Sequence, residues 1–271
     1  MTPAAPYAEV IGDPIAHSKS PLIHRFWLEA LGIAGEYHAT HVTPDTLADH
    51  LAMRRADPAW RGCNVTLPHK LAVMDLVDDP GDVRGSIGAM NTLLARDGRV
   101  TGTNTDAAGF YAPIADLPLA GAEVVVVGAG GAARAVLFAL ARADVGRVTI
   151  LARSPLKAAG LLARFGLHGQ VKAIDAPLPP ARLLVNASSL GMTGQPGLIL
   201  DLTRLPGDAA VYDLVYAPLV TPLLAAADAA GLETIDGLDM LVGQAAAAFE
   251  LFFGAAPPRE RDDELREKLI A

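Results

Sequence analysis

One stretch decides the fold of this 271-residue chain: Val124-Val125-Val126-Val127-Gly128-Ala129-Gly130-Gly131-Ala132-Ala133-Arg134. Four consecutive valines predict a strand that is buried on both faces, as the central strand of a parallel sheet is. The glycine-rich turn and the alanine-rich run after it predict the start of a helix. A strand, a glycine turn and a helix in this order form the context of a dinucleotide-binding fingerprint.

The individual residues of this turn suit a phosphate site. Gly128 permits a tight turn, and Gly130 lets the backbone approach a pyrophosphate because it has no Cβ. The small Ala133 allows close packing of the helix on the strand, and the helix N-terminus presents unpaired N–H groups to an anion. A tight turn that binds no ligand is the alternative. The predicted cofactor-binding residues here are Gly128, Ala129, Gly130, Gly131 and Ala132.

The residues after the next predicted strand, 148–151, indicate which dinucleotide is bound. No Asp or Glu occurs between Val148 and Leu162, so the carboxylate that holds the ribose of NAD is missing. Basic and hydroxyl side chains follow the strand instead, and an arginine here accommodates a 2′-phosphate. The sequence therefore predicts NADP rather than NAD; a solvated basic helix start is the alternative. The cofactor-binding residues predicted on this segment are Ala152, Arg153, Ser154 and Lys157.

The rest of the chain alternates between strands and helices, which predicts an α/β fold with mostly parallel sheets. Ser20 followed by Pro21 is typical of a helix N-cap with proline at the first helical position. A turn at 97–98 separates two strands that form a hairpin. We expect strands at 7–11, 37–42, 62–66, 89–94, 99–103, 183–186, 210–214 and around 234, and helices at 22–31, 44–55, 68–77, 240–253 and, charged and solvated, 259–268.

Composition excludes several classes of protein. The net charge of −8 leaves no basic stripe for a phosphate backbone, which argues against nucleic-acid binding. The longest apolar stretch, 124–141, is interrupted by glycines and Arg134, so we expect no membrane span, and no basic residue before Lys19 opens a signal peptide. A cytoplasmic protein is therefore expected. Cys63 is the single cysteine, and the histidines show no HExxH-like spacing, so we expect no metal.

Polar side chains follow several strands of the first half, at the positions where open α/β sheets bind ligands. Ser18 and Ser20 precede a helix and are candidates to hold a carboxylate, although helix capping alone would explain Ser20. Taken singly, the other polar residues are ordinary turn residues. Together they suit a polyhydroxylated acid: Asn64-Val65-Thr66, Pro68-His69-Lys70, Asn91-Thr92 and Asn104-Thr105-Asp106.

These segments, taken in order, resemble the shikimate dehydrogenase family over nearly the whole chain, from about residue 10 to 254. The resemblance rests on several motifs in a fixed order rather than on one. They are Gly12-Asp13-Pro14-Ile15-Ala16-His17-Ser18-Lys19-Ser20-Pro21, Asn64-Val65-Thr66-Leu67-Pro68-His69-Lys70, Gly88-Ala89-Met90-Asn91-Thr92, Asn104-Thr105-Asp106, Asn186-Ala187-Ser188-Ser189-Leu190-Gly191-Met192, Asp213-Leu214-Val215-Tyr216, Thr221-Pro222-Leu223 and Gly237-Leu238-Asp239-Met240-Leu241-Val242-Gly243-Gln244-Ala245.

The resemblance implies an N-terminal α/β substrate domain, formed by 1–106 with 238–271, and a Rossmann-type NADP-binding domain at 107–237, with a cleft between them. It also implies that shikimate or 3-dehydroshikimate is the small-molecule partner; a homodimer is left open. Ser18 and Ser20 would then hold the carboxylate. The remaining implied substrate-binding residues are Thr66, Lys70, Asn91, Asp106, Tyr216 and Gln244, and the further cofactor-binding residues are Asp82, Leu214 and Gly237.

By the same resemblance, Lys70 and Asp106 are the catalytic pair. Lys70 either exchanges the proton of the hydroxyl as base and acid or stays charged and stabilises a developing alkoxide. The family often has Asn-Arg-Thr where this chain has Ala152-Arg153-Ser154; Arg153 is retained. The implied activity is the reversible NADP-dependent interconversion of 3-dehydroshikimate and shikimate in aromatic amino acid biosynthesis, through chorismate.

Two alternatives to this activity stay open. The first is a quinate or quinate/shikimate dehydrogenase, including one that uses NAD, against which the missing acidic residue after Leu151 argues. The second is a non-catalytic sensor of the same fold that binds NADP, against which the presence of both Lys70 and Asp106 argues.

Overall fold

The structure, a computed structural model, describes residues 5–271 apart from the side chain of Lys157. It divides into two compact units. Unit 1 consists of the residues up to Thr105 together with Val242–Ala271, and unit 2 consists of Asp106–Leu241. The boundaries expected from the sequence, after residues 106 and 237, lie one and four residues from these. Each unit is described by itself below.

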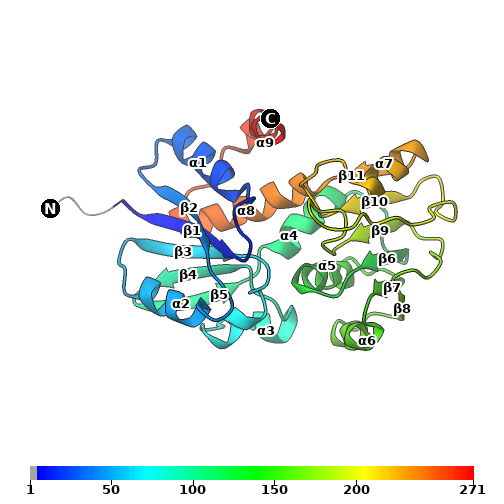
Figure 1. Ribbon diagram of the computed structural model, residues 1–271, viewed down its shortest axis with the longest axis horizontal. Helices are drawn as coiled ribbons and strands as arrows, with labels where there is room; N and C mark the ends of the chain where they lie inside the picture. The colour runs from blue at the N-terminus through cyan, green and yellow to red at the C-terminus, as the bar shows by residue number, and fades with distance from the viewer. Residues whose placement is uncertain (1–4) are drawn as a thin grey trace. The chain divides into compact units, whose positions relative to one another are not determined.

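Unit 1 is built on a mixed sheet whose strand order is β2-β1-β3-β4-β5 (Figure 1). The strands β1, β2 and β3 run parallel. Strand β4 pairs antiparallel with β3 on one side and with β5 on the other, and the hairpin turn at 97–98 joins β4 to β5. The elements are β1 (Tyr7–Gly12), α1 (Ser20–Leu31), β2 (Glu36–His41), α2 (Leu47–Arg55), β3 (Trp60–Val65), α3 (Val83–Ser86), β4 (Thr92–Arg96), β5 (Arg99–Thr103), the later part of α8 (Gly237–Phe253) and α9 (Asp262–Ile270).

The two faces of β1 carry different chemistry, because successive side chains of a strand point to opposite faces. Ala8 and Val10 pack with Phe252 of α8 in one apolar cluster. On the other face, Glu9 is fully buried and bonds to Arg54 of α2 through Nε at 2.8 Å and Nη2 at 3.1 Å. A buried ion pair, rather than apolar contact alone, therefore ties α2 to the sheet.

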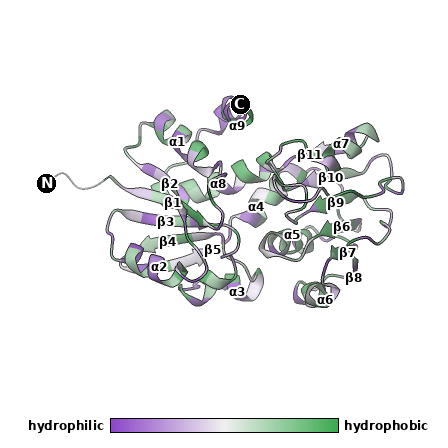
Figure 2. Cartoon of the chain, in the orientation of Figure 1, coloured by the Kyte–Doolittle hydropathy of each residue, from purple (hydrophilic) through white to green (hydrophobic). Residues whose placement is uncertain are grey.

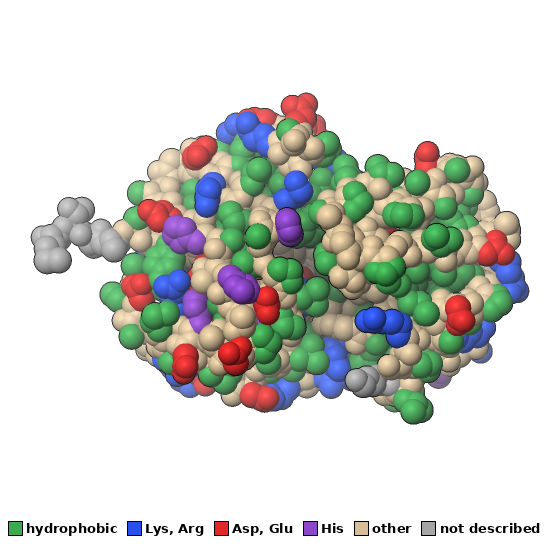
Figure 3. All heavy atoms as spheres, viewed as in Figure 1, with side chains coloured by type: hydrophobic (Ala, Val, Ile, Leu, Met, Phe, Trp, Pro, Cys, Tyr) green, Lys and Arg blue, Asp and Glu red, His purple; other side chains and the backbone are tan. Residues whose placement is uncertain are grey.

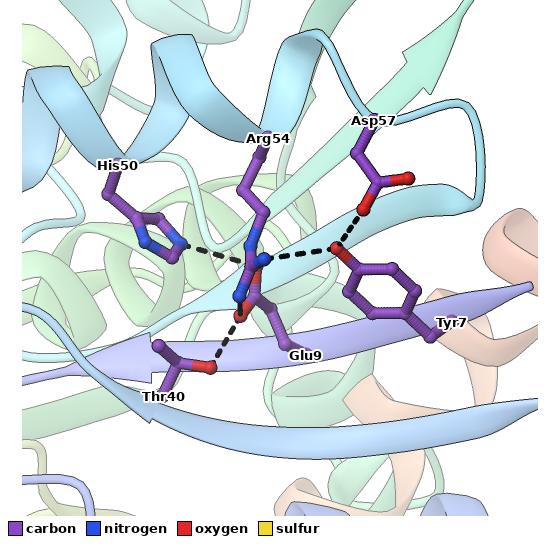
Figure 4. A network of polar contacts seen from close by, with 6 residues as sticks. All are labelled: Tyr7, Glu9, Thr40, His50, Arg54 and Asp57. Atoms are coloured by element: carbon purple, nitrogen blue, oxygen red, sulfur yellow. Dashed lines mark hydrogen bonds and ion pairs between the residues drawn. The ribbon is translucent and has the colours of Figure 1, made fainter.

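This ion pair belongs to a wider polar network, drawn in Figure 4. Nε2 of His50, one turn before Arg54 on α2, lies 3.2 Å from Oε1 of Glu9. The hydroxyl of Thr40 on β2 donates to the other oxygen of the Glu9 carboxylate. Arg54 also donates to the hydroxyl of Tyr7 at 3.1 Å. The carboxylate of Glu9 thus joins β1, β2 and α2 at one point.

Unit 2 is a parallel sheet with the strand order β11-β10-β9-β6-β7-β8. This is the Rossmann-like arrangement expected from the sequence. Its elements are α4 (Asp106–Tyr111), β6 (Glu123–Val127), α5 (Gly131–Arg142), β7 (Arg147–Ala152), α6 (Pro155–Arg164), β8 (Gly169–Ala173), β9 (Leu183–Asn186), β10 (Ala210–Asp213), α7 (Pro222–Ala229), β11 (Glu233–Ile235) and the first residues of α8.

The valine strand β6 lies inside this sheet, between β9 and β7. Val124 and Val126 pack into one apolar cluster with residues of α5 and α6, and Val125 and Val127 pack into a second cluster with residues of α7. All four valines are fully buried. Figure 2 shows the resulting hydrophobic colour of this strand. The prediction of a central strand covered on both faces is confirmed.

Three local predictions from the sequence are wrong. Ser20 is the first residue of α1 rather than its N-cap, which is Lys19. Residues 68–77 do not form an α-helix, because the carbonyl of Lys70 accepts from the N–H of Met90 at 2.8 Å instead of from the next helical turn. Only a short 3-10 turn forms there, at Ala72–Asp75. The helix at the end of the chain is not wholly solvated, because Leu265 and Leu269 of α9 are buried.

Candidate functional site

In unit 1, the carboxyl ends of β1 and β3 come very close together. The N–H of Asp13 donates to the carbonyl of Leu67 at 2.9 Å, and the N–H of Thr66 donates to that of Ile11 at 3.0 Å. A Cβ at Gly12 would lie 2.5 Å from the side chain of Thr66, so only glycine fits there. This contact places Thr66 directly beside the loop that leads to Ser18 and Ser20.

Asn91 is the centre of a buried polar cluster in unit 1. Its amide nitrogen donates to the hydroxyl of Thr105 at 2.9 Å and to the amide oxygen of Gln244 at 3.3 Å. Its own oxygen accepts from the N–H of Thr105 at 2.7 Å. The cluster holds the end of β5 and the helix α8 around one side chain. The structure therefore brings together two predicted substrate-binding residues, Asn91 and Gln244, from positions 153 residues apart.

The two serines lie at the start of α1. Ser18 is half-buried and its Oγ accepts from the N–H of Ser20 at 3.3 Å, while Ser20 is buried. Between them, the ammonium group of Lys19 donates to the carbonyl of Leu269 at 2.6 Å, which ties this loop to α9. Two hydroxyls and the first N–H groups of a helix form a suitable cradle for a carboxylate.

Lys70 is half-buried and lies on the turn after β3. The turn is anchored on both sides of it: the ring of His69 bonds to the carbonyl of Val42 at 2.6 Å, and the carbonyl of Lys70 accepts from Met90. Asp106 is buried at the first position of α4 in unit 2, directly after Thr105. The pairing of Lys70 with Asp106, across the two units, stays a prediction.

In unit 2, the turn between β6 and α5 fits a dinucleotide phosphate. Gly128 has φ +112°, and a Cβ there would lie 2.8 Å from the carbonyl oxygen of Ala187, so the position requires glycine. Within the described residues, a Cβ at Gly130 would meet nothing within 4 Å. Gly130 is also the N-cap of α5 and gives it no side-chain acceptor. The space and the N–H donors suit an anion.

The predicted selectivity segment follows β7. Ala152 is buried as the last residue of the strand, while Arg153 and Ser154 are exposed at the start of α6. An exposed guanidinium at this strand end can reach a 2′-phosphate. The side chain of Lys157, predicted for the same role, lies outside the described residues.

The remaining predicted cofactor residues lie in different units. In unit 2, a Cβ at Gly237 would lie 2.5 Å from the carbonyl oxygen of Leu214, so these two backbone segments touch. The half-buried Tyr216 follows Leu214 on the same loop, and burial raises the pKa of its phenol. Asp82, in unit 1, is exposed, and its backbone has the left-handed helical conformation. Its carboxylate caps the short α3 by accepting from the N–H of Gly85. Its predicted role at the cofactor stays a prediction.

A further polar cluster at the carboxyl ends of β9 and β10 went unassigned in the sequence reasoning. Asp213 is fully buried and accepts from the amide of Asn186 at 2.9 Å, the N–H of Val215 at 3.0 Å and the hydroxyl of Thr221 at 2.7 Å. Asn186 also donates to the carbonyl of Leu190 at 2.9 Å. The cluster fixes the loops that carry Leu214 and Tyr216. The sequence signal that could have identified this cluster is a polar residue, Asn186 or Asp213, at the end of each of two apolar strands.

Metal sites and membrane-spanning helices are both missing from the described part of the chain. Across residues 5–271, no group of three or more His, Cys, Asp and Glu side chains is placed to hold a metal ion. Figure 3 shows several histidines at the surface, and His38 and His41 each pair with one carboxylate, Glu36 at 3.0 Å and Asp13 at 2.8 Å. In the same part of the chain, no helix has the length and apolar character needed to span a membrane.

Comparison with known protein families gives two matches. Residues 10–93 match the shikimate dehydrogenase substrate binding domain, and residues 237–262 match the shikimate 5'-dehydrogenase C-terminal domain. The first match includes the β1 and β3 strand ends with their polar loops, and the second includes Gly237 and Gln244.

Comparison with individual proteins gives similarity over the whole chain. A shikimate dehydrogenase (NADP(+)) from Sphingopyxis alaskensis is 72% identical over 269 residues, which cover 99% of this chain and 98% of that protein. The crystal structure of shikimate 5-dehydrogenase from Thermus thermophilus in complex with NADP(H) and shikimate has a TM-score of 0.85 and 39% identity, covering 97% of this chain and 99% of that one. A quinate dehydrogenase from Corynebacterium glutamicum in complex with NAD has a TM-score of 0.84 and 30% identity, covering 97% and 99%.

Proposed function

This chain belongs to the shikimate dehydrogenase family, and from that premise we propose that it catalyses the reversible, NADP-dependent interconversion of 3-dehydroshikimate and shikimate. The observation that carries the proposal is the 72% identity over 99% of the chain with a shikimate dehydrogenase (NADP(+)). The reaction supplies shikimate to the biosynthesis of chorismate and the aromatic amino acids.

The substrate is a carboxylate with several ring hydroxyls, and the residues proposed to bind it match that chemistry. Ser18 and Ser20 hold the carboxylate with their hydroxyls and the start of α1. The ring hydroxyls bond to polar side chains, of which Asn91 and Gln244 are held by the Asn91 cluster and Thr66 lies against Gly12. The residues proposed for this second role are Thr66, Lys70, Asn91, Asp106, Tyr216 and Gln244.

NADP is held by the turn after β6 and by the residues after β7. The open space at Gly130 and the uncapped N–H groups of α5 receive the pyrophosphate, and Arg153 with Ser154 receives the 2′-phosphate. Leu214 and Gly237, whose backbones touch, lie on the loops proposed to line the nicotinamide side. The bound cofactor would supply the hydride acceptor as NADP and the hydride donor as NADPH for the reacting carbon of the substrate.

The protein handles the proton of the reacting hydroxyl. Lys70, held in place by the bonds of His69 and Met90 on its turn, accepts that proton during oxidation and returns it during reduction. Asp106, a buried carboxylate at the first position of α4, is proposed to order the reacting hydroxyl. Lys70 and Asp106 thus share the handling of the reacting hydroxyl in this scheme.

The direct test is to follow formation of the reduced nicotinamide cofactor by purified protein with shikimate, with quinate in place of shikimate, and with NAD in place of NADP. We expect kcat/KM to be highest for shikimate with NADP. Equal or higher values with quinate or with NAD would replace the proposal by the corresponding alternative. Binding of NADP without turnover of either acid would indicate a sensor.

Lys70→Ala tests the proton transfer. We expect kcat to fall by roughly 10²–10⁴-fold, the usual contribution of a general acid–base group, with little change in KM. Lys172→Ala, near the end of the edge strand β8, is the matched control and should keep the activity of the natural chain. A near-normal kcat in Lys70→Ala would remove this residue from the chemistry.

The proposal also covers the location of the enzyme in the cell and its assembly. We place the enzyme in the cytoplasm, where its cofactor is supplied. Assembly as a homodimer is also proposed, and light scattering of the purified protein decides it: a mass of about one chain, 28.1 kDa, would contradict a dimer.

A further inference from the structure

A hollow on the surface of unit 1 collects arginines. It has a volume of about 350 Å³ and lies among the end of α2, the start of β3 and the β4–β5 hairpin. Arg55, Arg61, Arg96 and Arg99 all line it, and Asp97 is the single acidic lining residue. The chain as a whole has a net charge of −8. The hollow is therefore a local cationic site on an acidic protein.

The arginines come from three separate segments, so the cluster is a product of the fold. Arg55 is the last residue of α2, and Arg61 is on β3. Arg96 and Arg99 flank the hairpin turn and lie directly opposite each other in the antiparallel register. Like charges at directly opposite positions destabilise a hairpin, because their side chains share one face of the sheet. An anion between them would remove this repulsion.

Few carboxylates balance these charges. Arg99 pairs with Asp78 at 2.9 Å, but the side chain of Arg99 is 74% exposed, so solvent screens this ion pair. Arg55 donates to the carbonyl of Leu76 at 3.3 Å and to no carboxylate among the described side chains. Within residues 5–271, neither Arg61 nor Arg96 has an ion-pair partner. The guanidinium groups of Arg61 and Arg96 are therefore left available to a ligand, and that of Arg99 is held only by a solvent-screened ion pair.

The chemistry of the hollow favours a phosphate group over other anions. A guanidinium group presents a planar fork of donors that bonds a phosphate through two oxygens at once, and several such groups can surround one dianion. The hollow has a volume of only about 350 Å³, so it does not form the long basic stripe that a nucleic acid needs. Trp60, the aromatic lining residue, is buried and offers no surface for base stacking or for insertion into a membrane.

We propose that this hollow binds a small phosphorylated molecule, through Arg61, Arg96, Arg99 and Arg55, at a site on unit 1 that is separate from the dinucleotide turn of unit 2. The ligand is a phosphate monoester or diphosphate that is small enough for the hollow. The proposal stands independently of the reaction that the enzyme catalyses.

Calorimetric titration of the full chain, first saturated with NADP, tests the proposal with inorganic phosphate and pyrophosphate as the probes. Saturation with NADP occupies the dinucleotide turn, so that pyrophosphate cannot bind there. We expect saturable binding of one pyrophosphate per chain, tighter than that of phosphate. Arg96→Gln and Arg99→Gln should each weaken it about tenfold, since each removes one charge-assisted contact.

Arg147→Gln is the matched control, because Arg147 is an exposed arginine at the start of β7 in unit 2. It should leave the affinity for pyrophosphate unchanged, and none of the three variants should be less stable to thermal unfolding than the natural chain by more than about 0.5 kcal/mol. Binding that the arginine substitutions do not weaken, or that citrate and sulfate reproduce equally well, would overturn the proposal. Tighter binding of short single-stranded RNA or anionic lipid vesicles, with no saturable binding of pyrophosphate, would overturn it as well.

Discussion

Each unit contains a fully buried carboxylate, and the pKa values of the two are shifted in opposite directions. Glu9 lies on β1 of unit 1, and Asp213 ends β10 of unit 2; the exposed fraction of each residue is 0%. Burial by itself raises the pKa of both groups, because a low-dielectric interior disfavours the ionised form. Their final pKa values differ because of what donates to each carboxylate.

Burial alone would raise the pKa of Glu9, but hydrogen bonds from His50, Arg54 and Thr40 outweigh it and lower the pKa to about 2. For Asp213, burial remains the largest effect and raises its pKa, because its donors are the neutral groups of Thr221, Val215 and Asn186. In this chain, the buried carboxylate with a cationic donor stays strongly acidic, and the one with neutral donors does not. Glu9 serves as an ion that fixes α2, and Asp213 serves as an acceptor that shapes loops.

The largest expected effect is on Glu9. Glu9→Gln should lower the free energy of unfolding by about 3 kcal/mol, because it leaves the charge of Arg54 without its buried partner. Denaturant unfolding measures this loss. Glu36→Gln, on the exposed start of β2, is the control and should change stability by less than about 0.5 kcal/mol. Equal losses in the two variants would show that the buried ion pair has no special weight.

The second prediction concerns acid. Since the folded-state pKa of Glu9 is about 2 against an ordinary 4.5, its contribution is fully present above pH 4.5 and is lost as the pH falls toward 2. The difference amounts to about 3 kcal/mol. The stability gap between the natural chain and Glu9→Gln should therefore narrow over this range, as unfolding curves at successive pH values would record. A gap that stays constant down to pH 2 would contradict the assignment.

A smaller effect is expected at Thr221, which donates to Asp213 and caps α7 by accepting from the N–H of Leu224 at 3.2 Å. Thr221→Ala should cost about 1–2 kcal/mol, as the loss of a helix cap does. Thr221→Ser keeps the hydroxyl and should recover most of this stability in thermal unfolding. If serine fails to recover it, then the methyl group rather than the hydroxyl matters here.

The smallest effect is expected for Asp213→Asn, at less than about 1 kcal/mol near neutral pH. The amide oxygen can still accept from Asn186 and Val215, and the buried charge is removed. Because the folded-state pKa of Asp213 is raised, its stabilising contribution is present below its ordinary pKa of 3.8 and is lost as the pH rises through the folded-state value. The natural chain should therefore lose stability relative to Asp213→Asn with rising pH. The opposite trend would mean that the pKa of Asp213 is lowered.

Local chemistry allowed much of unit 2 to be predicted from the sequence. The valines of β6 can be buried on both faces only in a sheet that is covered on both sides. Position 128 requires glycine because the turn there comes too close to the backbone of Ala187 for a Cβ. The exposed edge strand β8 has no such signal, since its residues are only partly buried. Propensity and pattern therefore identified the centre of the sheet and one edge strand, β11, which was expected around residue 234, and missed the other edge strand, β8.

Long-range bonds explain what the sequence did not reveal in unit 1. The helix predicted at 68–77 does not form because Met90, 20 residues further on, takes the carbonyl of Lys70. Likewise, nothing in the neighbourhood of Glu9 points to Arg54, which is 45 residues away. The family resemblance and the polar residues after predicted strands were enough to predict which residues belong to the candidate site. The hydrogen bonds that hold Asn91 and Asp213 could not be predicted in this way, because they join residues that only the tertiary structure brings together.

The discontinuity of unit 1 has a consequence for the growing polypeptide. Ala8, Val10 and Tyr37 share their apolar cluster with Ala248 and Phe252, which the ribosome adds more than 200 residues later. The segment Asp106–Leu241 contains its own sheet and clusters and can collapse as soon as it emerges. Unit 1 thus completes its interior after unit 2, and a nascent chain has an uncovered β-sheet face until residues 248–252 have been added.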